Sequence, residues 1–401
     1  MLGERDRFLL TLGDPRVVAH WVDSLFVGHT ARERGLHAAA ALLPARLQGR
    51  LLLRPVPRES APAAELLLTT LERDRGALLR QAGLDGRRPF TWIFLADYAA
   101  NDRGGGVAFL FDGGPRPRVV LKLRRPGVGV PCLAREWEAL HAVRGRLSPD
   151  LQPTIPAPLA FSADAGIEAL ATSWLPGRSA YVELQTALLP ARRLAGHFAA
   201  AAEWLAAFQR ATRAPGGPTP AEEGESLLAA GPGAWEGNAG RRAAWLDRLR
   251  GLERIASLAR GAAHGDFWAR NLLAGGAGAH GVGVVDWEGY APDAPPWRDL
   301  FHFPLSHALA YPWGPRYRRP PPAAALARAF LGDAALARQV RGYFVRWSTA
   351  AAVPPAVLAP LLHLELLDRS RRQAAGGSAE GDPWIELHHR LARADRSVFS
   401  G

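Results

Sequence analysis

Lysine is almost absent from this chain. It occurs once, as Lys122, although the 401 residues include 49 Lys and Arg side chains in all. Lys122 stands in the apolar run Val-Val-Leu-Lys-Leu over residues 119–123. Lysine is a compact point charge on a flexible stem, whereas arginine is a wide planar fork. A half-buried strand gains nothing from an ammonium group. The lysine therefore indicates a site that distinguishes lysine from arginine, such as a tight phosphate-binding site.

Cysteine and long apolar runs are also scarce. The single cysteine, Cys132, excludes an intramolecular disulfide. The best candidate for a membrane span, residues 348–364, is interrupted by Pro354, Pro355 and Pro360. The first residues, Met-Leu-Gly-Glu-Arg-Asp-Arg, are not followed by an apolar segment with a small-residue cleavage site. We therefore expect a cytoplasmic protein with no membrane partner.

The charge balance is strongly basic, with a formal net charge of +11. Basic surfaces attract phosphate backbones. The arginines are nevertheless scattered among alanine and leucine, and no nucleic-acid recognition motif accompanies them. We expect no nucleic-acid partner. The length favours two domains or lobes, each with its own core.

Three polar residues follow one another in a telling order in the second half of the chain. Asp266 follows His264 and Gly265, Asn271 comes five positions later, and Asp286 ends a short hydrophobic run. An isolated Asp-x-x-x-x-Asn is usually a turn or a helix cap. The whole order matches the kinase catalytic loop, H-R-D-x-x-x-x-N, with its following metal-binding Asp.

Two departures from that pattern are informative. Gly265 replaces the arginine, and Asp-Trp-Glu replaces Asp-Phe-Gly. With them the chain resembles the aminoglycoside phosphotransferase and choline kinase-like family, from about residue 90 to the C-terminus. The resemblance implies a two-lobed protein-kinase-like α+β fold. We expect an accessory segment over residues 1–86, a small lobe of antiparallel β-sheet plus one helix over 87–175, and a larger, mainly helical lobe with the catalytic loop and acceptor site over 176–401.

Phosphoryl transfer leaves the protein little covalent work beyond alignment and charge neutralisation. The cofactors that the resemblance implies are ATP and Mg²⁺. The amide oxygen of Asn271 and the carboxylate of Asp286 are hard oxygen ligands, which Mg²⁺ prefers. Asp266 would orient the acceptor hydroxyl and take its proton late in the reaction. His264, by the resemblance, would brace the catalytic loop.

Lys122 would bind the α- and β-phosphates of the nucleotide. The resemblance implies that a carboxylate on the next helix steadies this lysine, and Glu136 is our choice. Glu138 is the competitor, because the two positions lie about 200° apart on a helix and only one can face Lys122.

Three predicted strands over residues 90–123 form a meander joined by glycine turns. The first hairpin contains Gly104, Gly105 and Gly106, which we expect to contact the nucleotide phosphates. No G-x-G-x-x-G is present, so a flexible turn is the alternative reading.

Two further extended runs follow, near residues 155–162 and 167–174. The second leads into Thr172, Ser173, Trp174 and Leu175, a segment that resembles the hinge between lobes. The resemblance implies that backbone groups of these four residues bind the adenine edge. Beyond them the pattern becomes helical, as over residues 194–212.

Two further acidic residues and the N-terminal segment have no predicted catalytic role. Asp299 is expected to cap a helix or brace a loop, and Glu288 to lie near the metal or in solvent. Residues 1–86 contain a predicted helix over 61–81 and a possible strand at 51–55. They show no chemistry, so we interpret them as a piece that packs on the small lobe or binds a partner.

The acceptor is predicted to be a small molecule with a hydroxyl group. Residues 301–401, where the resemblance places much of its pocket, contain 13 arginines and 7 acidic residues. A polycationic aminoglycoside would need the opposite balance, so a neutral or anionic compound is favoured.

Two alternatives stay open. One is a nucleotide-binding pseudokinase that regulates a partner, although Lys122, Asp266, Asn271 and Asp286 are intact. The other is a protein kinase, which the missing Ala-Pro-Glu segment after Asp286 disfavours, as does the missing lysine two residues after Asp266. The sequence gives no indication of the oligomeric state.

Overall fold

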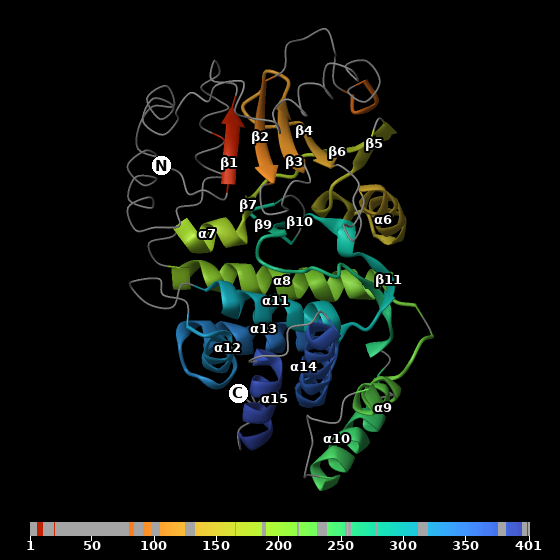
Figure 1. Ribbon diagram of the computed structural model, residues 1–401, viewed down its shortest axis with the longest axis vertical. Coiled ribbons are helices and arrows are strands. Elements are labelled where there is room, and N and C mark those ends of the chain that lie inside the picture. Colours follow the sequence, from red (N-terminus) through yellow and green to blue (C-terminus); the bar gives the residue numbers. More distant parts are fainter. Residues whose placement is uncertain are drawn as a thin grey trace.

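The computed structural model describes residues 6–10, 20, 80–83, 91–97, 105–124, 133–164, 166–186, 190–214, 216–230, 239–252, 255, 258–276, 280–311, 320–375, 382–394 and 399. Within these residues the chain forms two lobes. A twisted β-sheet with one flanking helix makes the upper lobe in Figure 1, and helices make the lower one. The predicted α+β, kinase-like architecture is confirmed, while the exact lobe boundaries at residues 87 and 176 stay predictions.

The small lobe is built on an antiparallel sheet with the strand order β1-β2-β3-β4-β6-β5. Its strands are β1 (Asp6–Leu10), β2 (Thr91–Asp97), β3 (Gly105–Phe111), β4 (Val119–Arg124), β5 (Pro158–Asp164) and β6 (Ile167–Ser173). The predicted meander is therefore present as β2, β3 and β4. The N-terminal segment adds an edge strand to it, because β1 pairs with β2 from Asp6↔Asp97 to Leu10↔Ile93.

Burial alternates along β4, as expected for a strand with one face in the core. Leu121 and Leu123 are buried in the small-lobe core, and Lys122 lies on the opposite, half-buried face. Helix α6 (Leu133–Arg146) follows β4 and turns Glu136, Leu140 and other residues inward. The strand and the helix thus present one lysine and one glutamate to the space between them.

The large lobe begins after β6. Its helices are α7 (Ala180–Thr186), α8 (Pro190–Thr212), α9 (Pro220–Ala230), α10 (Ala239–Gly251), α11 (Trp297–Ala310), α12 (Pro322–Leu331), α13 (Ala335–Ala351), α14 (Leu358–Ala375) and α15 (Pro383–Arg393). Short strands pair near the lobe junction: β7 (Arg178–Ser179), β8 (Gly261–Ala263), β9 (Leu272–Ala274), β10 (Val282–Val284) and β11 (Ala291–Ala294). Short 3-10 turns cover Gln152–Thr154, Trp287–Gly289 and Pro355–Val357.

Aromatic packing fixes the loops that bear the polar motifs. Trp204 of α8 stacks on Phe267, with ring centroids 5.4 Å apart, and Phe208 lies 5.7 Å from Trp287. All four side chains are fully buried. Burying a side chain of this kind is worth about 1.5–3 kcal/mol. Because Phe267 follows Asp266 and Trp287 follows Asp286, the buried rings hold each aspartate at a set place.

Some expectations fall outside the described residues: the possible strand at 51–55, most of the helix over 61–81, Cys132, and residues 312–319 of the proline-rich loop. His20 is described, and its ring lies 5.5 Å from Phe111 and 5.9 Å from Trp174. Part of the N-terminal segment therefore packs on the small lobe.

Within the described part of the chain, none of the helices alone has the length and apolar composition that a membrane crossing requires. Only α13 taken together with residues 355–375 meets that requirement, and this pair bends by 118° at its break.

Candidate active site

Lys122 is the centre of a charged cluster that joins the two lobes. Its Nζ donates to both carboxylate oxygens of Glu136, at 2.7 and 2.6 Å, and to Asp286 Oδ1 at 2.7 Å. Glu138, the competing carboxylate, is exposed on α6. The single lysine is therefore held between the small-lobe helix and the end of β10.

The charges of this cluster support one another. Burial lowers the pKa of Lys122, but the nearby Asp286 and Glu136 carboxylates outweigh it, so the pKa lies above its ordinary value. The Lys122 charge holds the pKa of Asp286 below its usual range. Lys122 and Asp286 are accordingly both charged at neutral pH.

Asp286 has a strained backbone. Its φ of 70° lies in the left-handed region, which is uncommon for a residue other than glycine. The next residue, Trp287, is anchored on both sides: its amide donates to Glu136 Oε1 at 3.3 Å and its indole to Val284 O at 3.0 Å. Such strain persists only where the surroundings hold it, and it gathers at functional sites.

The second polar pair lies in the catalytic loop, residues 264–271. Asn271 Nδ2 donates to the backbone oxygen of Asp266 at 3.0 Å and to its Oδ2 at 2.9 Å. Asn271 is buried, and the Asp266 side chain is 45% exposed. Burial raises the pKa of Asp266 and Asp286 raises it further, while His264 and Asn271 act in the opposite sense. A carboxylate fixed by an amide at a cleft can accept a hydrogen bond from an incoming hydroxyl group.

His264 and Asp299 brace this loop from beneath. Asp299 accepts from the amides of His264, at 2.6 Å, and Gly265, at 3.0 Å. His264 Nδ1 accepts from the Asp266 amide at 3.2 Å, and its Nε2 lies 3.0 Å from Val285 O. The imidazole thus links the loop to the segment that precedes Asp286. Asp299 lies in the first turn of α11 but does not cap it.

His302 is a site residue that the sequence analysis missed. Its Nε2 lies 3.5 Å from Asp266 Oδ1. Burial lowers the pKa of His302 well below its ordinary value, and the charges of Arg369, His264, Arg372 and Arg298 lower it further. The imidazole is therefore neutral at neutral pH. The available signal was helical spacing, since His302 follows Asp299 by three positions and shares its face of α11.

The glycines and the hinge are only partly described. Gly104 lies outside the described residues, and Gly105 and Gly106 begin β3, where they pair with Arg124 and Leu123 of β4. Their phosphate contact stays a prediction.

The hinge segment, residues 172–175, covers the last two residues of β6 and the two residues after it. The amides of Ser173 and Trp174 donate to Ala157 O and Arg118 O, and Thr172 pairs with Val120 of β4. No acceptor for the Leu175 amide is found among the described residues.

Glu288 is not simply in solvent, and its expected position near a metal stays a prediction. It pairs with Arg124 of β4, with Oε2 3.0 Å from Nη1, and its side chain is partly buried. This ion pair is a second link between the lobes beside the Lys122 cluster. Within the described residues, no three His, Cys, Asp or Glu side chains gather as an all-protein metal site would need.

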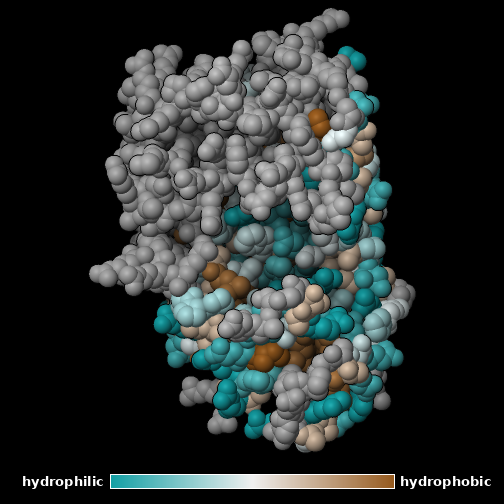
Figure 2. Space-filling model, viewed as in Figure 1, coloured by the Kyte–Doolittle hydropathy of each residue, from teal (hydrophilic) through white to brown (hydrophobic). Residues whose placement is uncertain are grey.

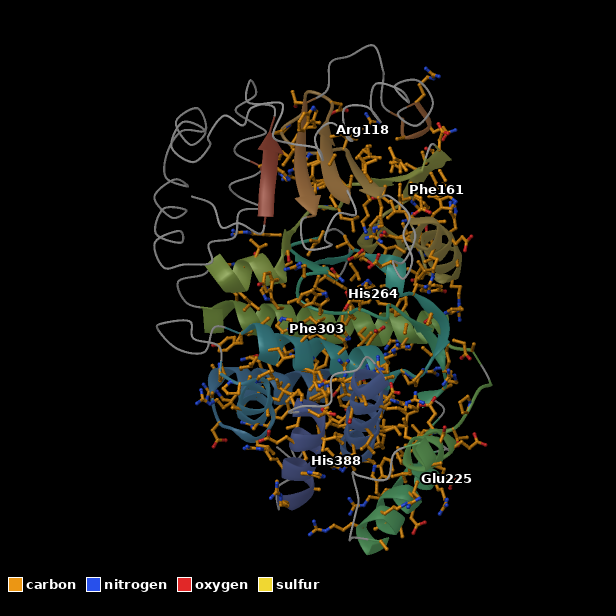
Figure 3. The ribbon with its side chains drawn as sticks, viewed as in Figure 1. Arg118, Phe161, Glu225, His264, Phe303 and His388 are labelled. Atoms are coloured by element: carbon orange, nitrogen blue, oxygen red, sulfur yellow. The ribbon has the colours of Figure 1, made fainter. Side chains whose placement is uncertain are left out.

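The site lies where the two lobes meet. Figure 3 shows His264 at mid-height, between the β-sheet and α11, where Phe303 is labelled. On the face drawn in Figure 2, a recess lined largely by hydrophilic residues lies at the same height. Lysine, glutamate, two aspartates and an asparagine from distant parts of the sequence therefore come together at one junction.

Fold and site together define a kinase-like protein. The model of the phosphotransferase enzyme family, APH, matches residues 99–343, which is more than half of the chain. The protein belongs to this family.

Two of the similar solved structures are aminoglycoside phosphotransferases. One is APH(3'')-Id from Streptomyces rimosus in complex with ADP and streptomycin. It shares 16% sequence identity with this chain, the match covers 84% of this chain and 98% of that chain, and the TM-score is 0.38. The other is an aminoglycoside-3'-phosphotransferase of type VIII, with 18% identity, 79% and 97% covered, and a TM-score of 0.33. No curated protein matches the sequence.

Proposed function

We propose that this protein transfers the γ-phosphoryl group of ATP, with Mg²⁺, to a hydroxyl group of a small molecule. The observation that carries the proposal is the position of Asp286. Its carboxylate contacts Lys122, which Glu136 holds, and its charge acts on Asp266 in the catalytic loop. A phosphate-binding cation, a metal-binding carboxylate and a hydroxyl-binding carboxylate thus lie within reach of one another, as phosphoryl transfer requires.

The nucleotide would lie between β4 and the hinge. Lys122 would bind the α- and β-phosphates as a point charge held in place by Glu136. The Leu175 amide is a free donor at the hinge within the described residues, so it is our candidate for a hydrogen bond to the adenine edge. The hairpin between β2 and β3, with Gly104, Gly105 and Gly106, would cover the phosphates.

Two residues offer oxygen atoms that fit Mg²⁺. Asn271 keeps its amide oxygen available, because its amide nitrogen makes both bonds to Asp266. Asp286 has a second carboxylate oxygen besides the one that accepts from Lys122. These hard oxygens suit an ion that takes few protein ligands and fills its shell with phosphate and water. Mg²⁺, when bound there, would supply positive charge that neutralises the phosphate oxygens.

Asp266 would act on the acceptor. Its Oδ2 is fixed by Asn271, and Oδ1 faces His302. The carboxylate would accept a hydrogen bond from the acceptor hydroxyl and align the oxygen with the γ-phosphorus. As the new O–P bond forms and the bond to ADP breaks, the hydroxyl proton passes to Asp266. Buried Phe267 and the bonds from Asp299 keep this geometry preorganised.

The proposal is tested by incubating the full chain with radiolabelled ATP, Mg²⁺ and a panel of neutral, anionic and cationic hydroxyl compounds. We expect label transfer to a neutral or anionic member. Asp266→Asn should bind ATP like the wild type but transfer about 10²–10⁴-fold more slowly. Tight ATP binding with no transfer to any acceptor would instead support a regulatory nucleotide-binding protein, and transfer by Asp266→Asn near the wild-type rate would refute the role of this aspartate.

A further inference from the structure

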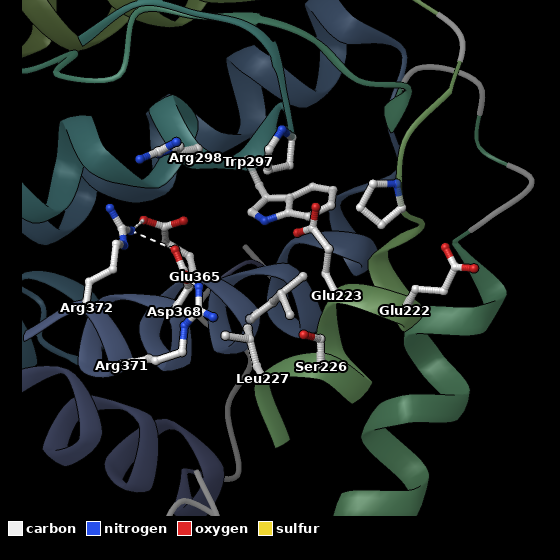
Figure 4. A pocket seen from close by; sticks show the side chains of 13 residues that line it. Glu222, Glu223, Ser226, Leu227, Trp297, Arg298, Glu365, Asp368, Arg371 and Arg372 are labelled. Atoms are coloured by element: carbon white, nitrogen blue, oxygen red, sulfur yellow. Dashed lines mark hydrogen bonds and ion pairs between the residues drawn. The ribbon is translucent and has the colours of Figure 1, made fainter. Parts of the chain in front are cut away.

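A pocket of about 410 Å³ lies between α9, the start of α11 and α14. Figure 4 shows it from close by. Trp297 and Leu227 provide apolar surface, and Ser226 provides a hydroxyl group. The remaining wall is charged, with four carboxylates and three arginines. The volume suits a small organic molecule that carries polar groups.

The carboxylates of this pocket already have partners. Glu222 accepts from the Thr219 amide at 2.7 Å, Glu223 from Arg260 at 2.6 Å, Glu365 from Arg369 at 2.7 Å, and Asp368 from Arg371 at 3.0 Å and Arg372 at 2.9 Å. A ligand ammonium group would have to compete with these arginines. The negative charges of the wall are therefore largely neutralised within the protein.

Arg298 is different from the other pocket arginines. Its Nε is buried and has no hydrogen-bond partner among the described residues. In Figure 4, dashed lines join Arg372 to the carboxylates of α14, and none reaches Arg298, which projects from α11 toward the same end of the pocket. A buried guanidinium donor without an acceptor costs free energy. An arginine Nε together with one Nη is the fork that binds a carboxylate or a phosphate with two parallel hydrogen bonds.

The pocket and His302 share helix α11. Arg298 and His302 are four residues apart on α11, so they are neighbours on one face of the helix. His302 in turn lies 3.5 Å from Asp266. The charge of Arg298 contributes to lowering the pKa of His302, which places the two within electrostatic reach. A ligand bound at Arg298 would thus extend toward the carboxylate that receives the acceptor hydroxyl.

We propose that Arg298 is the anchor for an anionic group, a carboxylate or a phosphate, on the acceptor. The inference rests on the proposed phosphotransferase function and narrows its substrate class to hydroxyl compounds with a negative charge. Arg371 and Arg372 set a positive rim, while Trp297 and Leu227 pack against the carbon skeleton. Arg298 is a specificity-determining residue and takes no part in nucleotide binding.

The test is a calorimetric titration of the full chain with two probes, inorganic phosphate and malonate. A non-hydrolysable ATP analogue with Mg²⁺ first fills the nucleotide site, so that the anions cannot bind at Lys122. We expect saturable binding of at least one probe to the wild type, weakened tenfold or more in Arg298→Gln. The tighter probe distinguishes a phosphate group from a carboxylate. Arg346→Gln is the matched control, because Arg346 is an exposed arginine on α13, 3.6 Å from Glu203.

Thermal unfolding without anions gives a second readout. Arg298→Gln should remain folded, because removal of an unpaired buried donor offsets the loss of the Arg298 charge near Asp299 and Glu365. A loss of anion binding in a folded Arg298→Gln protein would then come from the missing guanidinium group and not from unfolding. Equal probe binding by wild type and Arg298→Gln, or no binding by either, would overturn the proposal. The titration measures no phosphoryl transfer, so anion binding that depends on Arg298 would support the anion site even if the transfer assay failed. Conversely, transfer to neutral acceptors without anion binding would support the proposed function and refute the anion site.

Discussion

Gly265 lies so close to Gly289 that a β-carbon at residue 265 would overlap the carbonyl oxygen of Gly289. Gly265 also has a φ of +84°, which side chains rarely adopt. The residue between His264 and Asp266 is therefore glycine for two independent reasons. Protein kinases place an arginine at this position, and in this chain there is no room for one.

Replacing Gly265 with alanine should damage both folding and transfer. Strain and overlap together should lower the free energy of unfolding by about 2–5 kcal/mol. A shift of the loop that carries Asp266 by about 1 Å should slow transfer by about 10²-fold. Gly145→Ala is the control. Gly145 lies on α6, and a β-carbon at this residue would meet nothing within 4 Å. Chemical denaturation and a transfer assay check both values; a wild-type profile for Gly265→Ala would contradict the packing described here.

Asp299→Asn should loosen the catalytic loop without touching the nucleotide. Asparagine keeps one acceptor oxygen, and its amide group would face one of the two N–H donors that Asp299 now accepts from. An unmet buried donor costs about 1–3 kcal/mol. We expect that loss of stability, a lower kcat and an unchanged dissociation constant for ATP. Asp333→Asn, at a side chain that is 96% exposed, should change none of these.

Glu136→Gln should weaken nucleotide binding, and Glu138→Gln should not. Glutamine cannot provide the charge that orients Lys122, whereas Glu138 is exposed on the other side of α6. Loss of a charge-assisted contact predicts a rise in the dissociation constant of MgATP of roughly tenfold. Calorimetry measures this dissociation constant. Weaker binding in Glu138→Gln than in Glu136→Gln would show that Glu138, and not Glu136, orients Lys122.

Glu223 should make stability depend on pH. Burial raises its pKa from 4.5 to about 7, against the pull of Arg260 and with help from Asp368 and Glu365. A folded-state pKa above the unfolded value favours the protonated form of the folded protein. This contribution is fully present below pH 4.5 and is lost as pH rises through 7, by up to about 3 kcal/mol.

Denaturation curves at pH 5 and pH 8 check this dependence. The fall in the free energy of unfolding between the two pH values should be smaller in Glu223→Gln than in the wild type. Glu225→Gln, at an exposed carboxylate of the same helix, should keep the wild-type fall. Equal slopes in Glu223→Gln and the wild type would contradict the burial argument.

The sequence predicted the parts of the site that short spacings define. Asp266 and Asn271 are five residues apart in one loop, so their contact follows from the motif itself. Helical geometry allowed only one of Glu136 and Glu138 to face Lys122, and the contacts of Lys122 decide for Glu136, our choice. The contact of Lys122 with Asp286 spans 164 residues, and only the resemblance could place the two together.

Contacts between distant elements escaped the sequence. His302 reaches Asp266 because α11 packs beneath the catalytic loop. Its spacing from Asp299 places both residues on one face of the helix but does not say which loop that face meets. The sequence left two roles open for Asp299, a helix cap or a loop brace. The buried amides of the catalytic loop need an acceptor, and Asp299 provides it, so its role is to brace the loop. The pairing of β1 with β2 joins residues more than 80 positions apart, which periodicity within either strand cannot reveal.

The most direct test of the account is the dissociation constant of ATP, measured by calorimetry with and without Mg²⁺. We predict that Mg²⁺ tightens ATP binding to the wild type by at least about tenfold, and that Asp266→Asn keeps this gain because Asp266 serves the acceptor. Asp286→Ala should lose it. An undiminished Mg²⁺ gain in Asp286→Ala would contradict the assignment of Asp286, and with it the phosphoryl-transfer site at the junction of the lobes.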